Sequence, residues 1–170
     1  ILLINQASFS DAIILIEAIL RDDDKNFKLY YLLGICHFKL ENLDLAELNL
    51  KKSINLKKNF GDALHNLGIV FNLKKKFDDA QDCFLKSLKI EPKNVETLIE
   101  LGRNYEMTKN FNDAKKYYFE ALRLENSNKI ANGLLGRMLI SIGFQKEGMK
   151  FLKKSTGIVR FNERKFEILK

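Results

Sequence analysis

Residues of the types that most often carry chemistry are few and scattered in this sequence of 170 residues. Its two histidines, His37 and His65, lie in different parts of the chain, and no group of histidine, cysteine and carboxylate residues has the spacing of a zinc site. A phosphate-binding glycine loop is also missing from the sequence. We therefore expect no catalytic residue, no metal and no cofactor in this segment.

The two cysteines, Cys36 and Cys83, fall at packing positions of predicted helices. Free cysteine is among the most buried residue types and behaves as a small apolar residue. We expect both thiols to be unpaired and buried, which suits a reducing compartment. The sequence also has no apolar run as long as a membrane span and no recognisable secretion signal, so we expect a cytoplasmic protein and no membrane partner.

The helices that position these residues are clearest between Gly61 and Asn94, where the spacing of apolar residues predicts a helix hairpin. The first helix carries apolar and small residues at i, i+3, i+4 and i+7, namely Leu64, Leu67, Gly68 and Phe71. The second helix has a face made of Phe77, Ala80, Phe84 and Leu88. Pro92 then ends the second helix, because proline cannot continue it.

The landmarks of this hairpin recur every 34 residues along the chain. The recurring positions hold Gly34, Gly68, Gly102 and Gly136 on the first helix, and Ala46, Ala80 and Ala114 on the second. Glycine inside a helix costs about 1 kcal/mol relative to alanine, so its repeated use needs a compensating gain. We expect the glycines to let the second helix approach the first, and the large residues Phe77, Phe84, Phe111 and Tyr118 to fill the space between repeats.

With this period the chain resembles the tetratricopeptide repeat family. Its central repeat reads Leu64-x2-Leu67-Gly68-x2-Phe71, then Ala80-x3-Phe84, then Pro92, with Leu64 where the family often has tryptophan. The resemblance implies an all-α fold, a right-handed α-α superhelix (solenoid) of helix hairpins. It also implies a non-enzymatic scaffold that binds a protein or peptide, because this family consists chiefly of binding scaffolds.

The repeats divide the chain, which we interpret as a single domain, residues 1–170. A partial repeat at 1–26 is followed by complete repeats at 27–60, 61–94, 95–128 and 129–162. Residues 163–170 are expected to begin a C-terminal capping helix or another repeat. In the fourth repeat Gly148 replaces the alanine and Gly157 falls late in the second helix, which predicts a shorter helix there. Because the chain begins inside a repeat, we expect it to be a fragment of a longer protein.

Members of this family bind ligands on the concave wall formed by the first helices of successive repeats. The resemblance assigns this peptide-binding groove to Tyr31, Ile35, Asp62, His65, Asn66, Ile69, Glu100, Arg103 and Arg137. Asn66 could bond the main chain of a peptide, or it could be a solvated helix residue. Arg103 and Arg137 could hold a carboxylate between them, or they could pair with Glu100 and neighbouring acidic residues.

The excess of basic residues does not indicate nucleic acid. The 29 Lys and Arg residues exceed the 22 Asp and Glu residues, which gives a net charge of +7. Most lysines fall on second helices and in turns, a pattern typical of a solvated outer surface. The arginines do not cluster with aromatic residues, as a nucleic-acid surface would favour.

Two further interpretations stay open. The array could be a docking or dimerisation arm of a larger multidomain enzyme of the transferase or oxygenase type, since arrays of this family often precede such domains. The chain could also self-associate through the array ends, because Ile1-Leu2-Leu3-Ile4 forms an apolar end.

Overall fold

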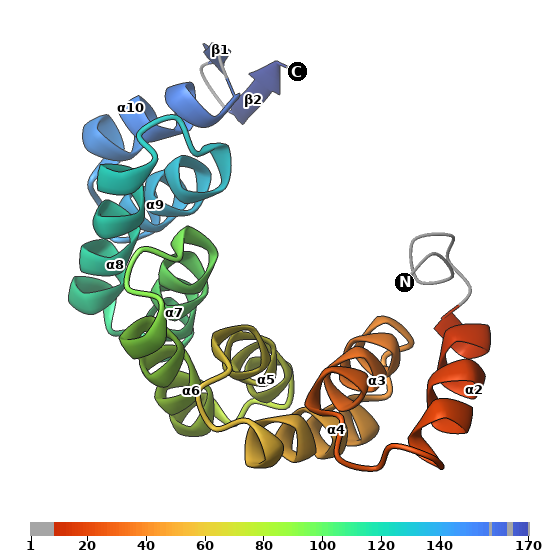
Figure 1. The fold of residues 1–170 in the computed structure, drawn as a ribbon. Coiled ribbons are helices and arrows are strands. Elements are labelled where there is room, and N and C mark those ends of the chain that lie inside the picture. The colour runs from red at the N-terminus through yellow and green to blue at the C-terminus, as the bar shows by residue number, and fades with distance from the viewer. Residues whose placement is uncertain (1–8, 157, 163–164, 170) are drawn as a thin grey trace. The chain divides into compact units, whose positions relative to one another are not determined.

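The computed structural model describes residues 9–156, 158–162 and 165–169 (Figure 1). The chain consists of two compact units, Ile1–Pro92 and Lys93–Lys170, which are treated separately below. The apolar end Ile1–Ile4 and Gly157, both singled out in the sequence, lie outside the described residues.

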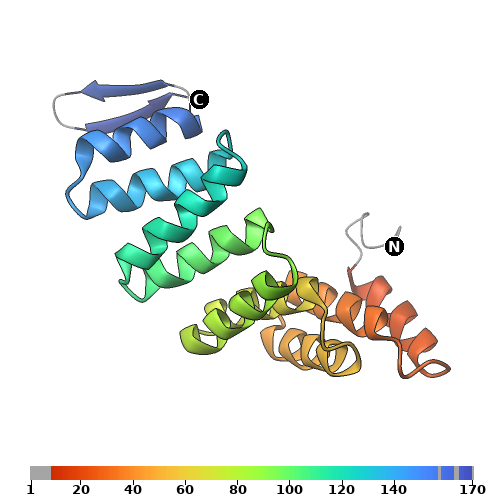
Figure 2. The same ribbon diagram turned by 60° about the vertical axis from the view of Figure 1, so that its left-hand side comes forward.

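The first unit consists of helices that pack on one another in chain order (Figure 2). Its elements are α2 (Phe9–Leu20), α3 (Phe27–Lys39), α4 (Leu43–Leu56), α5 (Gly61–Leu73) and α6 (Phe77–Ile90). Helices α3 and α4 form one hairpin and α5 and α6 form the next, while α2 packs on α3 and α4 packs on α5. A buried apolar cluster joins α2 to α3 through Ala12, Ile16, Tyr30, Leu33 and Cys36.

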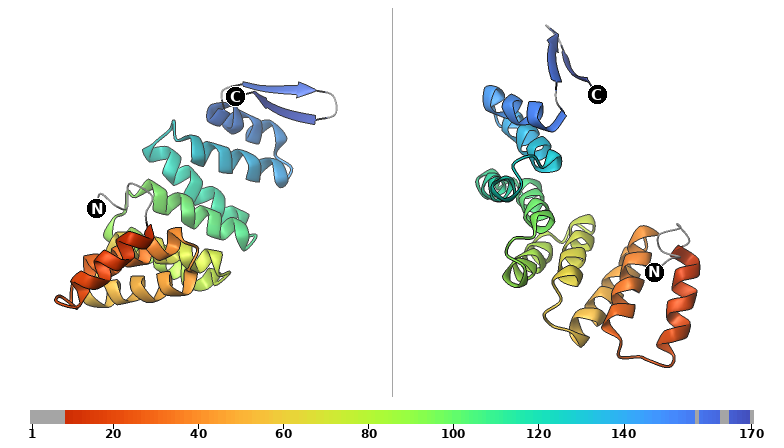
Figure 3. Two further views of the ribbon diagram at one scale, coloured as in Figure 1. Left: turned by 90° about the vertical axis from the view of Figure 1, so that its right-hand side faces the viewer. Right: turned by 45° about the horizontal axis from the view of Figure 1, so that its top comes forward.

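The second unit repeats this arrangement and then changes its secondary structure (Figure 3). Its helices are α7 (Val95–Met107), α8 (Phe111–Leu124), α9 (Lys129–Ser141) and α10 (Gln145–Thr156). Helices α7 and α8 form a hairpin, α9 and α10 form another, and α8 packs on α9. Two strands follow, β1 (Ile158–Asn162) and β2 (Lys165–Leu169).

Strand β2 corrects the prediction of a capping helix or a further repeat, as far as that prediction covers residues 165–169. Strand β2 pairs with β1 in antiparallel register, from Ile158 opposite Leu169 to Asn162 opposite Lys165. The prediction of a capping helix or a further repeat was wrong because it followed apolar spacing and gave too little weight to strand-forming residue types. Isoleucine and phenylalanine, which favour strands, occur in both segments, and valine occurs in β1. The helical fold class therefore holds for the repeats, and the hairpin departs from it.

Each repeat is held together where a glycine of the first helix meets a large residue of the second. A Cβ atom on Gly68 would lie 2.6 Å from Cε1 of Phe84, and one on Gly102 would lie 2.7 Å from Cδ1 of Tyr118. Gly34 faces Leu50 in the same way, with 2.7 Å to Cγ. The prediction that these glycines permit close approach of the two helices is confirmed.

This packing also corrects the expected role of two aromatic residues. Phe84 and Tyr118 are fully buried, but their rings lie on the glycine of their own hairpin. They were expected to fill the space between repeats, whereas they fill the space inside one. The reason is that a glycine leaves a pocket on the first helix that only a large facing side chain can fill.

In the last hairpin two glycines, Gly136 and Gly148, face each other. A Cβ atom on Gly148 would lie 2.5 Å from the carbonyl oxygen of Gly136, so neither position has room for a side chain. Helix α10 has 12 residues, whereas α4, α6 and α8 have 14 each. The expected shortening of the second helix in the fourth repeat is confirmed.

The turn between the two helices of a repeat also recurs, through one residue with positive φ. Glu41, Lys75 and Lys109 have φ of 60°, 59° and 62°, and Gly143 at the equivalent position has φ of 95°. A left-handed backbone conformation costs a residue with a Cβ atom roughly 1–2 kcal/mol. Three of the four turns therefore carry local strain, which the packing of the hairpins offsets.

We expect the Gly68→Ala substitution to lower the free energy of unfolding by about 1–3 kcal/mol, because the new methyl group collides with the Phe84 ring. Without that collision, alanine would raise helix stability by about 1 kcal/mol. Urea unfolding followed by circular dichroism measures the change. In a double-mutant cycle the added Phe84→Ala substitution should relieve the collision, so that the two changes cost less than the sum of their separate effects. A stabilised Gly68→Ala variant would contradict the packing described here.

We expect Lys109→Gly to raise the free energy of unfolding by about 0.5–1 kcal/mol, because glycine adopts positive φ without steric cost. Lys116→Gly, at an exposed position within α8, is the matched control and should instead lower stability by about 1 kcal/mol. Thermal unfolding of the two variants beside the parent chain distinguishes these signs. Equal effects of the two substitutions would rule out strain at the turn.

Candidate functional site

The first unit brings together the residues expected on the inner wall of α3 and α5. Asn66 on α5 donates a hydrogen bond from Nδ2 to the Tyr31 hydroxyl of α3 at 3.3 Å, and another to the Asp62 carbonyl at 2.8 Å. Both side chains are half-buried. Among the described residues no hydrogen bond reaches Asn66 Oδ1, so this oxygen can accept one from a ligand N–H.

Tyr31 is fixed on this wall by its ring as well as by its hydroxyl. Its ring centroid lies 5.0 Å from that of Phe60. Burial raises the pKa of the Tyr31 phenol most, the negative charge of Asp62 raises it further, and the hydrogen bond with Asn66 partly opposes both. The phenol therefore stays protonated at neutral pH and can both donate and accept hydrogen bonds.

The remaining predicted residues of the first unit have different surroundings. Asp62 is exposed, and Ile35 and Ile69 are half-buried. Asp62, Asn66 and Ile69 are spaced by three and four residues and therefore lie on one face of α5. The His65 ring instead lies 6.1 Å from the ring of Phe84, so the histidine contacts the interior of its own hairpin.

The second unit contains the other predicted residues, Glu100, Arg103 and Arg137. Arg103 Nε lies 3.7 Å from Glu100 Oε1, one turn earlier on α7. Burial raises the pKa of Glu100, and the nearby Arg103 partly opposes this. The pairing of Arg103 with Glu100 is the second of the two arrangements considered from the sequence. Arg137 lies on α9 and is exposed.

A groove that the sequence did not indicate lies between helices α4 and α6 of the first unit. This outer groove has a volume of about 660 Å³. Its lining residues are Glu47, Lys51, Ile54, Asn55, Lys58, Asn59, Leu64, Leu67, Phe71, Lys76, Asp79, Asp82, Cys83, Lys86, Lys89 and Ile90. Lysines that were interpreted as a solvated coat therefore surround an apolar floor. The signal that could have revealed it is the small Cys83 at a position where a later repeat has Phe151.

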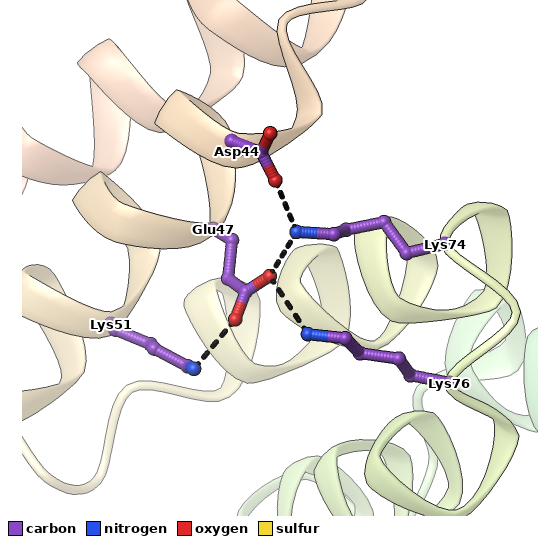
Figure 4. A network of polar contacts seen from close by, with 5 residues as sticks. All are labelled: Asp44, Glu47, Lys51, Lys74 and Lys76. Carbon is purple, nitrogen blue, oxygen red and sulfur yellow. Dashed lines mark hydrogen bonds and ion pairs between the residues drawn. The ribbon is translucent and has the colours of Figure 1, made fainter.

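Glu47, which lines the outer groove, is the centre of an ion-pair network (Figure 4). Lys51 and Lys74 each lie 2.6 Å from a carboxylate oxygen of Glu47, and Lys76 lies 3.6 Å away. Lys74 also contacts Asp44 at 2.5 Å. The network joins α4 to the turn between α5 and α6.

Several effects act on the pKa of Glu47. Burial of the carboxylate, whose side chain is 12% exposed, is the largest and would raise the pKa. The hydrogen bonds and positive charges of Lys51 and Lys74 together outweigh it and lower the pKa to about 2. Glu47 is therefore ionised at neutral pH and stabilises the junction between the two hairpins of this unit.

Two kinds of feature are absent from the described residues. These residues contain no group of three or more His, Cys, Asp or Glu side chains placed to hold a metal ion. Within the same residues, no helix has the length and apolar character that crossing a bilayer requires.

Stacked helix hairpins with a repeated glycine contact define a helical-repeat protein of the α-solenoid class. Sequence models described as tetratricopeptide repeat match residues 27–60 and 61–94. Residues 27–94 therefore consist of tetratricopeptide repeats. Proteins of this kind generally serve as scaffolds for other proteins rather than as enzymes. Among curated proteins, none is significantly similar in sequence to this chain.

Solved structures with the same fold cover most of this chain. A MamA structure is 20% identical to this chain, with 90% of each chain covered and a TM-score of 0.82. MamA from Desulfovibrio magneticus RS-1 is 17% identical, with 91% of this chain and 88% of that chain covered and a TM-score of 0.85. PilW, a type IV pilus biogenesis factor, is 18% identical, with 91% of this chain and 72% of that chain covered and a TM-score of 0.85. At these identities the likeness shows the fold alone.

We expect Glu47→Gln to lower the free energy of unfolding by about 1–2 kcal/mol at pH 7, because the lysines lose their partner while water screens part of the effect. The folded-state pKa of Glu47 is lowered, so its contribution is complete above the ordinary pKa of 4.5 and is lost as pH falls toward 2. The difference between the parent chain and the variant should therefore shrink across this window, as urea unfolding at several pH values can measure.

The matched control for Glu47→Gln is Asp82→Asn. Asp82 pairs with Lys86 at 3.1 Å, but both side chains are more than half exposed, so this change should cost little. A difference between Glu47→Gln and the parent chain that stays constant from pH 6 to pH 3 would contradict the role of Glu47.

Proposed function

We propose that the inner wall of α3 and α5 binds a peptide or helix of a partner protein, and that α7 and α9 offer the equivalent wall in the second unit. The observation that supports this proposal most directly is the link from Asn66 on α5 to Tyr31 on α3. It holds polar groups of two successive first helices in one fixed arrangement. A pre-arranged surface loses little entropy when a ligand binds.

The side chains on this wall offer a ligand three kinds of contact, namely hydrogen bonds, apolar surface and a negative charge. Asn66 Oδ1 and the Tyr31 hydroxyl can set the register of a ligand by hydrogen bonds. The half-buried Ile35 and Ile69 offer apolar surface, and burial of such surface contributes about 25 cal/mol per Å². Asp62 is exposed beside them and favours a basic group on the ligand. This mixture suits a protein segment better than a polyanion.

The comparisons support a protein partner in general terms. One similar structure, 20% identical and covered over 31% of its length, is described as the APC/C hetero-tetramer Cut9–Hcn1. A repeat array of this fold thus occurs within an assembly of different proteins. We propose the same kind of use here, with a protein or peptide as the ligand and no nucleic acid or membrane.

Docking or dimerisation within a larger enzyme of the transferase or oxygenase type is the alternative use of the same array. Light scattering at several concentrations separates the two uses. Dimerisation would appear as a mass that rises with concentration of the chain alone, whereas a scaffold for a different protein would stay monomeric until the partner is added.

We expect Asn66→Ala and Arg103→Ala each to reduce capture of bound proteins from a cell extract about tenfold, as loss of a central interface contact does. Quantitative mass spectrometry of the captured proteins gives the measurement. Asn112→Ala and Arg123→Ala, at exposed positions of α8, are the matched controls and should leave capture unchanged. If capture survives both substitutions and also Tyr31→Ala, with helicity retained, the inner wall is not the binding surface.

A further inference from the structure

The outer groove has an apolar floor that belongs to the first helix of the repeat. Leu64, Leu67 and Phe71 of α5 line it, together with Cys83 of α6. Helices α4 and α6 both pack on α5, so the face of α5 between them forms the bottom of the hollow. Because the inner wall uses Asn66 and Asp62 of the same helix, α5 contributes different residues to two surfaces.

The groove is open because of two particular side chains. Two repeats later, the positions equivalent to Lys51 and Cys83 hold Phe119 and Phe151. These two rings meet edge to face, with centroids 5.5 Å apart and an interplanar angle of 80°. Aromatic rings therefore fill the corresponding place between α8 and α10. The small Cys83 and the flexible Lys51 leave it unfilled between α4 and α6.

Charge differs between the two ends of the outer groove. At the Glu47 end, Lys51 and Lys76 are bound to that carboxylate, as described above. At the other end, where Ile54 and Ile90 form apolar walls, Lys58 and Lys89 also line the groove. Within the described residues, no carboxylate forms an ion pair with either of these two lysines.

We propose that the outer groove binds an acidic amphipathic helix of a partner protein. The apolar face of that helix lies on Leu64, Leu67 and Cys83, and its carboxylates lie near Lys58 and Lys89. Helices α4 and α6 bond most of their backbone groups internally, so they offer few main-chain partners to an extended peptide. A helical ligand brings its own backbone hydrogen bonds and needs only apolar and charged side chains, which this groove matches.

This site is independent of the inner wall. The inner wall consists of first helices and carries hydrogen-bonding side chains and charged side chains of both signs. The walls of the outer groove are second helices, and lysines outnumber acidic residues among its lining residues. The isoleucines make the two sites distinguishable, because Ile54 and Ile90 line the outer groove and Ile35 and Ile69 lie on the inner helices.

The test uses the full chain and a synthetic helical peptide about as long as α4, which has 14 residues. The peptide carries leucine at i, i+3 or i+4, and i+7, flanked by glutamates. A second peptide with the same leucines and lysine in place of each glutamate is the control ligand. Fluorescence anisotropy measures affinity, and methyl NMR of the isoleucine residues locates the peptide.

We expect the acidic peptide to bind, the basic peptide to bind at least about tenfold more weakly, and added salt to weaken the acidic peptide. Binding of the acidic peptide should shift the methyl NMR signals of Ile54 and Ile90. Cys83→Phe should weaken binding about tenfold, because it fills the groove as Phe151 does between α8 and α10.

The combined Lys58→Glu and Lys89→Glu variant should weaken binding to a similar degree. These two residues are exposed, so the variant also decides the matter if Cys83→Phe fails to fold. Lys129→Glu, at an exposed position of α9, is the matched control and should have no effect.

Several results would overturn the proposal. Perturbation of Ile35 and Ile69 alone would place the helix on the inner wall and would support only the function proposed above. Equal affinity for the two peptides, or no binding of the acidic one, would exclude this ligand class. Binding of oleate or of phosphatidylserine vesicles in its place would assign the groove to lipid. Self-association that Cys83→Phe abolishes would assign it to a second copy of the chain.

Discussion

The contact between a glycine on the first helix and a large residue on the second sets the geometry of every repeat. Where Gly68 meets Phe84, the aromatic ring occupies the space that a side chain at position 68 would need. The two helices can approach only because one partner has no Cβ atom. The hairpin is therefore a rigid unit with one face committed to its own interior, and the remaining faces of the first helix are available for other contacts.

Helix α5 shows how those remaining faces are used. Leu64, Leu67 and Phe71 are buried and line the outer groove, while Asn66 donates a hydrogen bond to Tyr31 of α3. A helix that packs on three neighbours has little surface left. Each residue on it consequently has a defined environment, and a substitution can affect one surface without the other.

Ion pairs also connect separate elements of the first unit. Counting lysines along the sequence indicated a solvated coat, yet Lys51, Lys74 and Lys76 converge on Glu47 from two different elements. The burial of this carboxylate is tolerated because several cations surround it. The neighbouring Lys58 and Lys89 form no ion pair among the described residues. The lysines at the two ends of the outer groove therefore differ, being paired with Glu47 at one end and unpaired at the other.

The sequence by itself determined the repeat and the pairing of helices, because a period of 34 residues with glycine at one place is a local pattern. It also determined which residues of α3 and α5 share a face, since helical spacing fixes that. It failed at residues 158–162 and 165–169, where short apolar segments fit a helix or a strand and antiparallel pairing decided between them. Only the tertiary structure decided the outer groove and the Glu47 network. Both depend on side chains such as Lys51 and Cys83 that come from separate helices, and their meeting is a property of packing that no single segment records.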